Sequence, residues 1–118
     1  MKITGIEATA ISVPVKASFW TSLQAMGGGK AVSELIVKVH TDDGLIGLGE
    51  GHGGPPLAAA KLIQGELQEL LIGEDPLRPE YLWQKLFSIT HTRRSAWQVW
   101  GISREQLEVA LAAIDIAL

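Results

Sequence analysis

The stretch from Thr41 to Gly54, TDDGLIGLGEGHGG, constrains the fold more than any other part of the sequence. Its Asp-Asp-Gly at 42–44 supplies residue types that tolerate a positive φ, so we expect a tight turn that joins two antiparallel strands. The second of these strands covers Leu45 to Glu50, and its Gly47 and Gly49 carry no side chain. Glycines inside a strand indicate close approach by another element, so we expect something to pack against this face.

Two further stretches have the composition of strands. Lys2 to Pro14 alternates loosely and closes on a proline. The faces that this alternation predicts are Ile3, Ile11 and Val13 on one side and Ile6, Ala8 and Ala10 on the other. Ala31 to Thr41 is rich in β-branched residues, and its alternation separates Leu35, Val37 and Val39 from Lys38 and His40. Between these strands, Lys16 to Lys30 has no period and is expected to be a loop.

Beyond Gly54 the pattern becomes helical. Pro55-Pro56 can open a first helix, which Gly73 ends. Its apolar stripe is Ala60, Ile63, Leu67, Leu70 and Leu71. A second helix is expected from Pro79, and the capping box Ser103-Arg-Glu-Gln106 begins the last one, while residues 91 to 101 fit no pattern. Strands first and helices later predict an α+β fold: a three-stranded antiparallel meander followed by three to four helices.

Composition narrows the class of protein. With 118 residues, the chain is about one domain long. Ten basic against thirteen acidic residues leave a net charge of -3, which argues against a nucleic-acid surface. The absence of cysteine excludes disulfides and thiolate metal sites and is compatible with a reducing compartment. The sequence contains neither a signal peptide nor a membrane span, so we expect a cytoplasmic protein.

Two features predict that the chain has a partner. The hydrophobic fraction of 47% is high for so small a domain, and Trp83, Trp97 and Trp100 are either core residues or face another domain or subunit. The helical repeat from Leu107 runs to Leu118 without a glycine, a proline or a terminal basic residue. We therefore expect a helix cut in mid-course, in a fragment of a longer protein.

Gly49 to Gly54, GEGHGG, has the G-x-G-x-x-G spacing of a dinucleotide-binding loop. Such a loop requires a parallel strand after its helix, whereas Gly73 to Pro76 leads into another helix. Glu50 would also place a negative charge beside the phosphates. We therefore do not expect nucleotide binding.

The three histidines share no metal-ligand spacing. His40 is expected on the exposed face of a strand and His91 at a helix end. His52 is different because glycines flank it in a loop that follows a strand. It either contacts a substrate or is a solvent-exposed loop histidine.

At Ile36 to Gly51, IVKVHTDDGLIGLGEG, the chain resembles the N-terminal region of the mandelate racemase/muconate lactonizing enzyme family, part of the enolase superfamily. Three more segments agree in the same order. Met1 to Glu7 resembles the family's opening strand, Leu71 to Pro76 its inter-helix turn, and Ala110 to Leu118 the helix that leads into its barrel.

The resemblance implies that residues 1–118 form an N-terminal capping domain, cut near the start of a C-terminal (β/α) barrel. In such enzymes a base takes the proton next to a substrate carboxylate, and Mg²⁺ bound by barrel carboxylates stabilises the enediolate. These groups would all lie beyond Leu118. No catalytic residue and no metal ligand is therefore assigned in this chain, and no cofactor is expected to bind to this fragment alone.

The cap's role in the family also carries over as an expectation. Two loops of the cap close over the barrel mouth, and here they correspond to Lys16 to Gly29 and Glu50 to Pro56. The implied substrate-facing residues are Phe19, Trp20, Thr21, Met26 and His52. The implied partners are the barrel, a small carboxylate substrate and further copies of the chain in a homo-oligomer.

Two hypotheses follow. The first is the cap of an isomerase or lyase, a racemase, cycloisomerase, epimerase or acid-sugar dehydratase, inactive without its barrel. The second is a stand-alone interaction module that self-associates through its apolar helical face.

Overall fold

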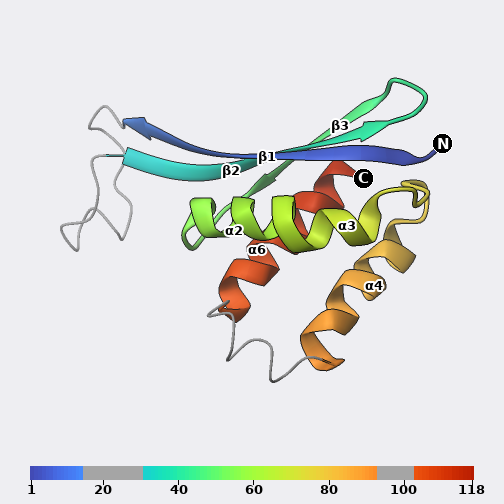
Figure 1. Ribbon diagram of the computed structural model, residues 1–118. Helices are drawn as coiled ribbons and strands as arrows, with labels where there is room; N and C mark the ends of the chain where they lie inside the picture. The colour runs from blue at the N-terminus through green and yellow to red at the C-terminus, as the bar shows by residue number, and fades with distance from the viewer. Residues whose placement is uncertain (15–30, 93–102) are drawn as a thin grey trace.

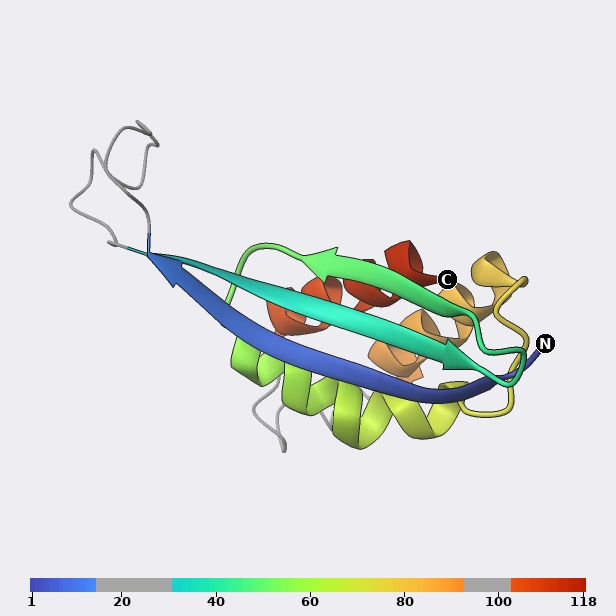
Figure 2. The ribbon, with the colours of Figure 1, turned by 90° about the horizontal axis from the view of Figure 1, so that it is seen from above.

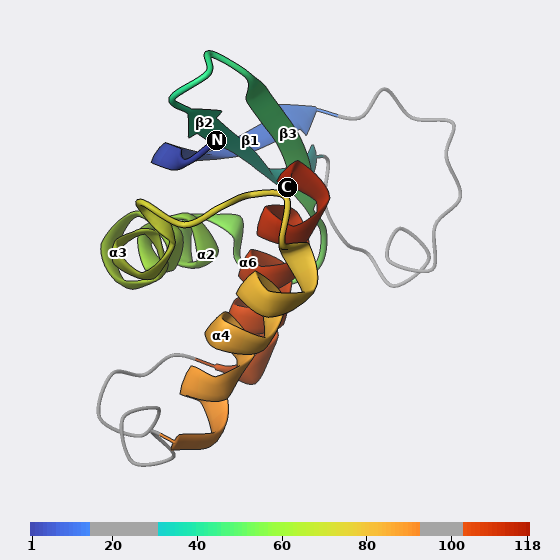
Figure 3. The same cartoon turned by 90° about the vertical axis from the view of Figure 1, so that its right-hand side faces the viewer.

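The computed structural model describes residues 1–14, 31–92 and 103–118, with the side chains of 89–92 also outside the description. Three strands come first, β1 (Ile3–Pro14), β2 (Ala31–Thr41) and β3 (Ile46–Gly51). The helical segments that follow are α2 (Pro56–Leu62), η1 (Ile63–Leu67), α3 (Gln68–Leu71), α4 (Pro79–Thr92) and α6 (Arg104–Ala117). One face of the sheet carries the helices, and no described helix covers the other (Figures 1 and 3).

The sheet has the order β1-β2-β3, and both pairs of neighbours are antiparallel. Figure 2 shows the three strands side by side above the helices. Gly44 has a φ of +82° in the turn between β2 and β3, as the Asp-Asp-Gly pattern predicts. Leu35, Val37 and Val39 are buried, which confirms the predicted inner face of β2.

The predicted faces of β1 are wrong at its start. Ile3 lies in the core together with Ile6 and Ala8, whereas Ile11 and Val13 are 37% and 53% exposed. The register shifts by one residue between Ile3 and Gly5. Because such an irregularity inverts the alternation, it returns Ile3 to the inner face, and simple alternation along the sequence cannot reveal it.

The segments α2, η1 and α3 form one continuous helical run with a π-helical turn in the middle. The predicted apolar stripe points into the protein, and Gly73, with a φ of +85°, follows its end. Gln64 Nε2 donates to Ala8 O at 2.9 Å, and Gln68 Oε1 accepts from Ile6 N at 3.3 Å. These two amides satisfy backbone groups on the edge of β1, a role that the sequence analysis missed.

The other helices complete the core. Lys85 on α4 donates from Nζ to Leu70 O at 2.7 Å and pairs with Glu74, which ties α4 to the preceding turn. The capping box at the start of α6 is confirmed, because Ser103 Oγ accepts from Gln106 N at 3.2 Å and Gln106 Oε1 accepts from Ser103 N at 3.1 Å. The inner face of α6 packs against β3.

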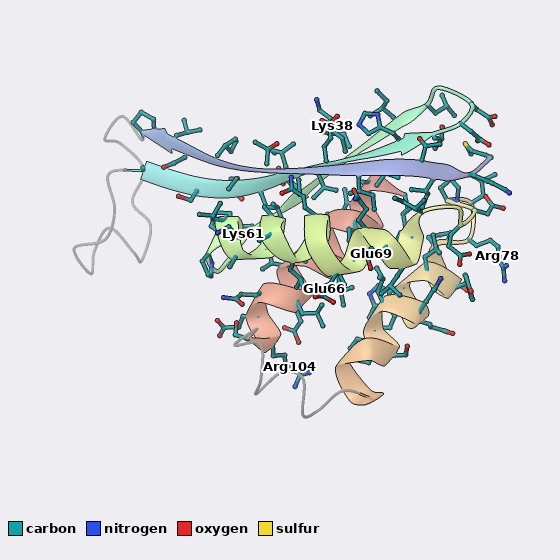
Figure 4. The ribbon with its side chains drawn as sticks, in the orientation of Figure 1. Lys38, Lys61, Glu66, Glu69, Arg78 and Arg104 are labelled. Carbon is teal, nitrogen blue, oxygen red and sulfur yellow. The ribbon has the colours of Figure 1, made fainter. Side chains whose placement is uncertain are left out.

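The uncovered face of the sheet mixes charged and apolar side chains. Lys38 lies on this face, opposite the helices that carry Glu66, Glu69 and Arg104 (Figure 4). Ile46 and Leu48 are 58% and 63% exposed there. The fold is thus the predicted α+β arrangement, with one three-stranded antiparallel sheet backed by helices and, within the described residues, no barrel.

Candidate functional site at the end of the sheet

The position of the glycine-rich loop is set by the strand before it. A Cβ added at Gly47 would lie 1.7 Å from Ala117 O, and one at Gly49 would lie 2.0 Å from Ala113 O. At Gly51 it would meet Val109 Cγ1 at 2.9 Å. The backbone of β3 therefore lies directly on α6, as the strand glycines predict, and the loop begins from a fixed point.

The loop between β3 and α2 covers residues 52–55. Gly53 and Gly54 have φ values of +91° and +77°, which side-chain-bearing residues rarely adopt. No atom of the described residues lies within 4 Å of a Cβ placed at either position. Pro56 opens α2 in its first turn, as predicted. These glycines therefore serve the backbone conformation of the loop, not close packing.

His52 is held by a carboxylate from the neighbouring strand. Its Nδ1 lies 2.7 Å from Glu34 Oε1. The His52 side chain is 76% exposed and that of Glu34 only 23%. His52 is thus an exposed loop histidine whose imidazole has a specific, partly buried partner, and its contact with a substrate stays a prediction.

Glu34 was missed by the sequence analysis, although the hairpin register points to it. Leu35 pairs with Gly51, so the next position on each strand places Glu34 opposite His52. Counting outward from the turn at Asp42-Asp43-Gly44 reaches the same pair. Glu34 Oε2 is itself buried and has no hydrogen-bond partner among the described residues.

The two loops assigned to the cap start from the same end of the sheet. Pro14, the last residue of β1, pairs with Ala31, the first residue of β2, and the two bound the segment 15–30. β3 ends opposite Leu35 on the same side of the sheet. Phe19, Trp20, Thr21 and Met26 fall outside the described residues, so their placement stays a prediction, and the structure places only His52 of the five candidates.

The other titratable candidates do not join this site. His40 Nε2 lies 3.0 Å from Glu7 Oε1 on the uncovered sheet face, and Lys38 Nζ lies 3.9 Å from Glu7 Oε2. His40 is only partly exposed. The side chain of His91 lies outside the description. Glu50 is exposed beside the loop and makes no ion pair with any described residue.

Trp83 on α4 is 41% exposed and stacks on Phe87 with ring centroids 4.7 Å apart. Trp97 and Trp100 lie outside the described residues.

An open groove of about 580 Å³ runs beside Trp83, lined by Pro79, Glu80, Trp83, Gln84, Asp115 and Leu118. It has no base or nucleophile beyond two separate carboxylates, so it supports no catalytic assignment.

No three His, Cys, Asp or Glu side chains in the described ranges are grouped so that they could hold a metal ion. The residues described here therefore do not fit the Mg²⁺ that the family resemblance implies.

The same part of the chain has no helix long and apolar enough to cross a membrane. The G-x-G-x-x-G segment runs from β3 into α2, and the described strands form one antiparallel sheet, which differs from the parallel sheet of a dinucleotide-binding fold.

Comparison with solved structures identifies the architecture. The chain superposes with a TM-score of 0.70 and 27% identity on a putative mandelate racemase from Bordetella bronchiseptica RB50, solved with 2-oxoglutarate/phosphate, covering 98% of this chain and 27% of that one. A dipeptide epimerase from Enterococcus faecalis V583, solved with Mg and the dipeptide L-Leu-L-Tyr, shares the fold with a TM-score of 0.69 at 24% identity, over 99% of this chain and 30% of that chain. The class is therefore the N-terminal domain of enolase-superfamily enzymes.

Residues 5–118 match the family described as mandelate racemase / muconate lactonizing enzyme, N-terminal domain, and the chain belongs to this family. It is 35% identical over 119 aligned residues to a D-galactonate dehydratase family member of Paenibacillus sp. (strain JDR-2). That alignment covers 99% of this chain and 23% of the relative, so the chain spans about a quarter of the relative's length. The comparisons give no support to a stand-alone interaction module.

Proposed function

We propose that residues 1–118 form the capping domain of a longer enzyme that abstracts the proton next to a substrate carboxylate. The observation that carries this proposal is the family match over residues 5–118 to a domain that makes up about a quarter of its enzymes. The relatives include a dehydratase family member and a putative racemase, and both reactions can begin with this proton abstraction. Racemase, cycloisomerase, epimerase and acid-sugar dehydratase activities remain open.

In this proposal the chain closes and shapes the active site, and a C-terminal barrel holds the bases and Mg²⁺. The loops proposed for this role, residues 16–29 and 50–56, would exclude water from the pocket, and the strand ends next to them, Pro14 of β1 and Gly51 of β3, lie toward the same end of the sheet. Phe19, Trp20, Thr21, Met26 and His52 are the proposed substrate-facing residues.

The test uses the longer protein and the 118-residue chain side by side. Each is incubated in D₂O with a panel of hydroxy acids, acid sugars and N-acyl amino acids, and α-proton exchange is followed by NMR with Mg²⁺ and with EDTA. We expect Mg²⁺-dependent exchange on at least one acid in the longer protein and none in the chain alone. Exchange that survives EDTA, or that the chain catalyses by itself, would overturn the proposal.

A second experiment tests the loops. Single alanine variants of the five proposed residues in the longer protein should raise KM for the acid that exchanges, since these residues contact the substrate and not the reacting bond. Lys61→Ala, on the exposed side of α2, is the matched control and should leave KM unchanged. If all five variants retain the parent KM, the loops do not face the substrate.

Two further proposals concern the whole protein. We place it in the cytoplasm, which agrees with the absence of cysteine from the 118-residue chain.

We also propose a homo-oligomer, supported by exposed apolar side chains such as Ile46, Leu48 and Trp83. Sedimentation of the longer protein at several concentrations tests the second point, and a monomer at all of them would refute it.

A further inference from the structure

The feature that carries a new inference is the pair between His52 and Glu34. The two residues lie opposite one another where β2 and the end of β3 part, and Nδ1 of the imidazole is 2.7 Å from Oε1 of the carboxylate. An exposed histidine flanked by Gly51 and Gly53 would otherwise have several rotamers and two tautomers available. A single short contact to a strand side chain restricts both.

The environment of Glu34 strengthens this contact. Its side chain is only 23% exposed, and Oε2 is buried without a hydrogen-bond partner in the described part of the chain. A partly desolvated carboxylate attracts a donor more strongly than a fully hydrated one. Because Oε2 has no partner there, the contact through Oε1 is the carboxylate's one hydrogen bond among the described residues.

The backbone of Glu34 is held in place by the strand to which it belongs. It lies within β2, where its antiparallel partner on β1 is Ile11, and the adjacent Leu35 is fully buried. His52, in contrast, belongs to a loop with two positive-φ glycines after it. Glu34 is thus the rigid member of the pair, and it holds the loop residue His52 in position.

We propose that Glu34 is a positioning residue that fixes His52 in the Nδ1-protonated tautomer and leaves Nε2 as the nitrogen offered to the substrate. A carboxylate accepts hydrogen bonds only, so the neutral imidazole must carry its proton on Nδ1. Nε2 then holds a lone pair, and no described residue bonds to it. This nitrogen accepts a hydrogen bond from a hydroxyl group, which favours hydroxyl-bearing acids among the substrates in the proposed function, on which this inference rests.

The tautomer is tested directly on the 118-residue chain. Long-range ¹H–¹⁵N spectra of histidine-labelled protein at alkaline pH distinguish a protonated Nδ1 from a protonated Nε2. We expect His52 to be Nδ1-protonated in the parent chain and to move to the Nε2-protonated form, which an unpaired imidazole favours, in Glu34→Ala. A parent chain with Nε2 protonated would overturn the inference.

Glu50→Ala is the matched control, because it removes an exposed carboxylate two positions from His52 without touching the pair. It should leave the tautomer of His52 unchanged, and an equal response to both variants would mean that general charge, not the contact, sets the tautomer. Glu34→Gln keeps the side-chain shape and guards against a folding defect in Glu34→Ala. Its neutral amide offers Nδ1 a donor as well as an acceptor, so the Nδ1-protonated fraction should fall between those of the parent and of Glu34→Ala, and a fraction above that of the parent would count against the inference.

The functional arm is a double-mutant cycle in the longer protein. Glu34→Ala and His52→Ala should each raise KM for a hydroxy acid by about tenfold, the value of one hydrogen bond, and the double variant should lose no more than either alone. Additive losses would overturn the positioning role. If the tautomer responds to Glu34 but His52→Ala leaves KM unchanged, the proposed lid role of this loop fails while Glu34 still positions His52.

Discussion

β3 and the loop that follows it are both rich in glycine, for opposite reasons. At Gly47 and Gly49 a Cβ would collide with carbonyl oxygens of α6, at 1.7 Å and 2.0 Å. At Gly53 and Gly54 there is open space, but φ is positive. Gly47 and Gly49 are required because α6 leaves no room for a side chain. Gly53 and Gly54 are required because the loop backbone has a positive φ at these positions.

The difference explains a misleading pattern. The G-x-G-x-x-G spacing joins two glycines that pack on α6, Gly49 and Gly51, to one loop glycine, Gly54, so its match to a dinucleotide motif combines two unrelated requirements. The difference between strand and loop also separates two roles. The strand β3 packs against α6, whereas the loop after Gly51 does not make that contact and can bind a ligand.

The largest expected effect comes from Gly49→Ala. The added methyl group cannot be accommodated without moving the backbone of α6, so the free energy of unfolding should fall by about 3 kcal/mol. Urea denaturation of the 118-residue chain followed by circular dichroism measures it.

Gly65→Ala is the control for that experiment, since nothing lies within 4 Å of a Cβ at this helical position. It should raise stability by roughly 0.5 kcal/mol, because alanine loses less backbone entropy than glycine on folding. A loss below about 1 kcal/mol in Gly49→Ala, the least that such overpacking costs, would mean that β3 and α6 are not in close contact.

A smaller loss is expected from Gly53→Ala. No neighbour obstructs the methyl group, but an alanine with a φ near +91° is strained by about 1–2 kcal/mol. The same denaturation experiment measures the effect, and a high-resolution structure of the variant should show change confined to residues 51–56. Full stability in the variant would show that the loop adopts negative φ without cost, which would remove the contrast between the two regions.

Ser103→Ala probes the helix that holds β3. Loss of the hydroxyl that accepts from Gln106 N should cost about 1 kcal/mol. Ser33→Ala is the comparison, because its hydroxyl is exposed and, among the described residues, contacts only Ser12, at 3.5 Å. Equal losses in both variants would contradict a specific role for the cap.

The smallest effect on folding is expected from His52→Gln. An exposed loop side chain contributes within about 0.5 kcal/mol, so the denaturation midpoint should stay close to that of the parent chain. A loss of more than about 1 kcal/mol would place His52 among the structural residues and weaken its assignment to a ligand site.

Local patterns were enough to predict most elements. Asp42-Asp43-Gly44 specified the turn, Pro56 and Gly73 bounded the first helical run, and Ser103 with Gln106 specified the start of α6. Each signal acts through its own backbone or through neighbours within four residues, so it can be recognised without knowing the fold. The π-helical turn in that run was not foreseen, because no single residue requires it.

Contacts between distant segments required the tertiary structure. The irregularity near Gly5 moved Ile3 into the core, and Gln64 and Gln68 proved to bond the edge of β1. Glu34 was overlooked because an isolated glutamate on a strand gives no local sign of a partner. Its partner is set by register, which the turn fixes only once the two strands are known to pair.

By itself the sequence determined the order of elements, the hairpin and the glycine face of β3, since these follow from residue types and short spacings. Tertiary structure alone decided which element lies on those glycines, which side chains satisfy the edge of the sheet, and which carboxylate holds His52. Such pairings join residues from 18 to more than 60 positions apart, and their geometry exists only after the sheet and helices have packed.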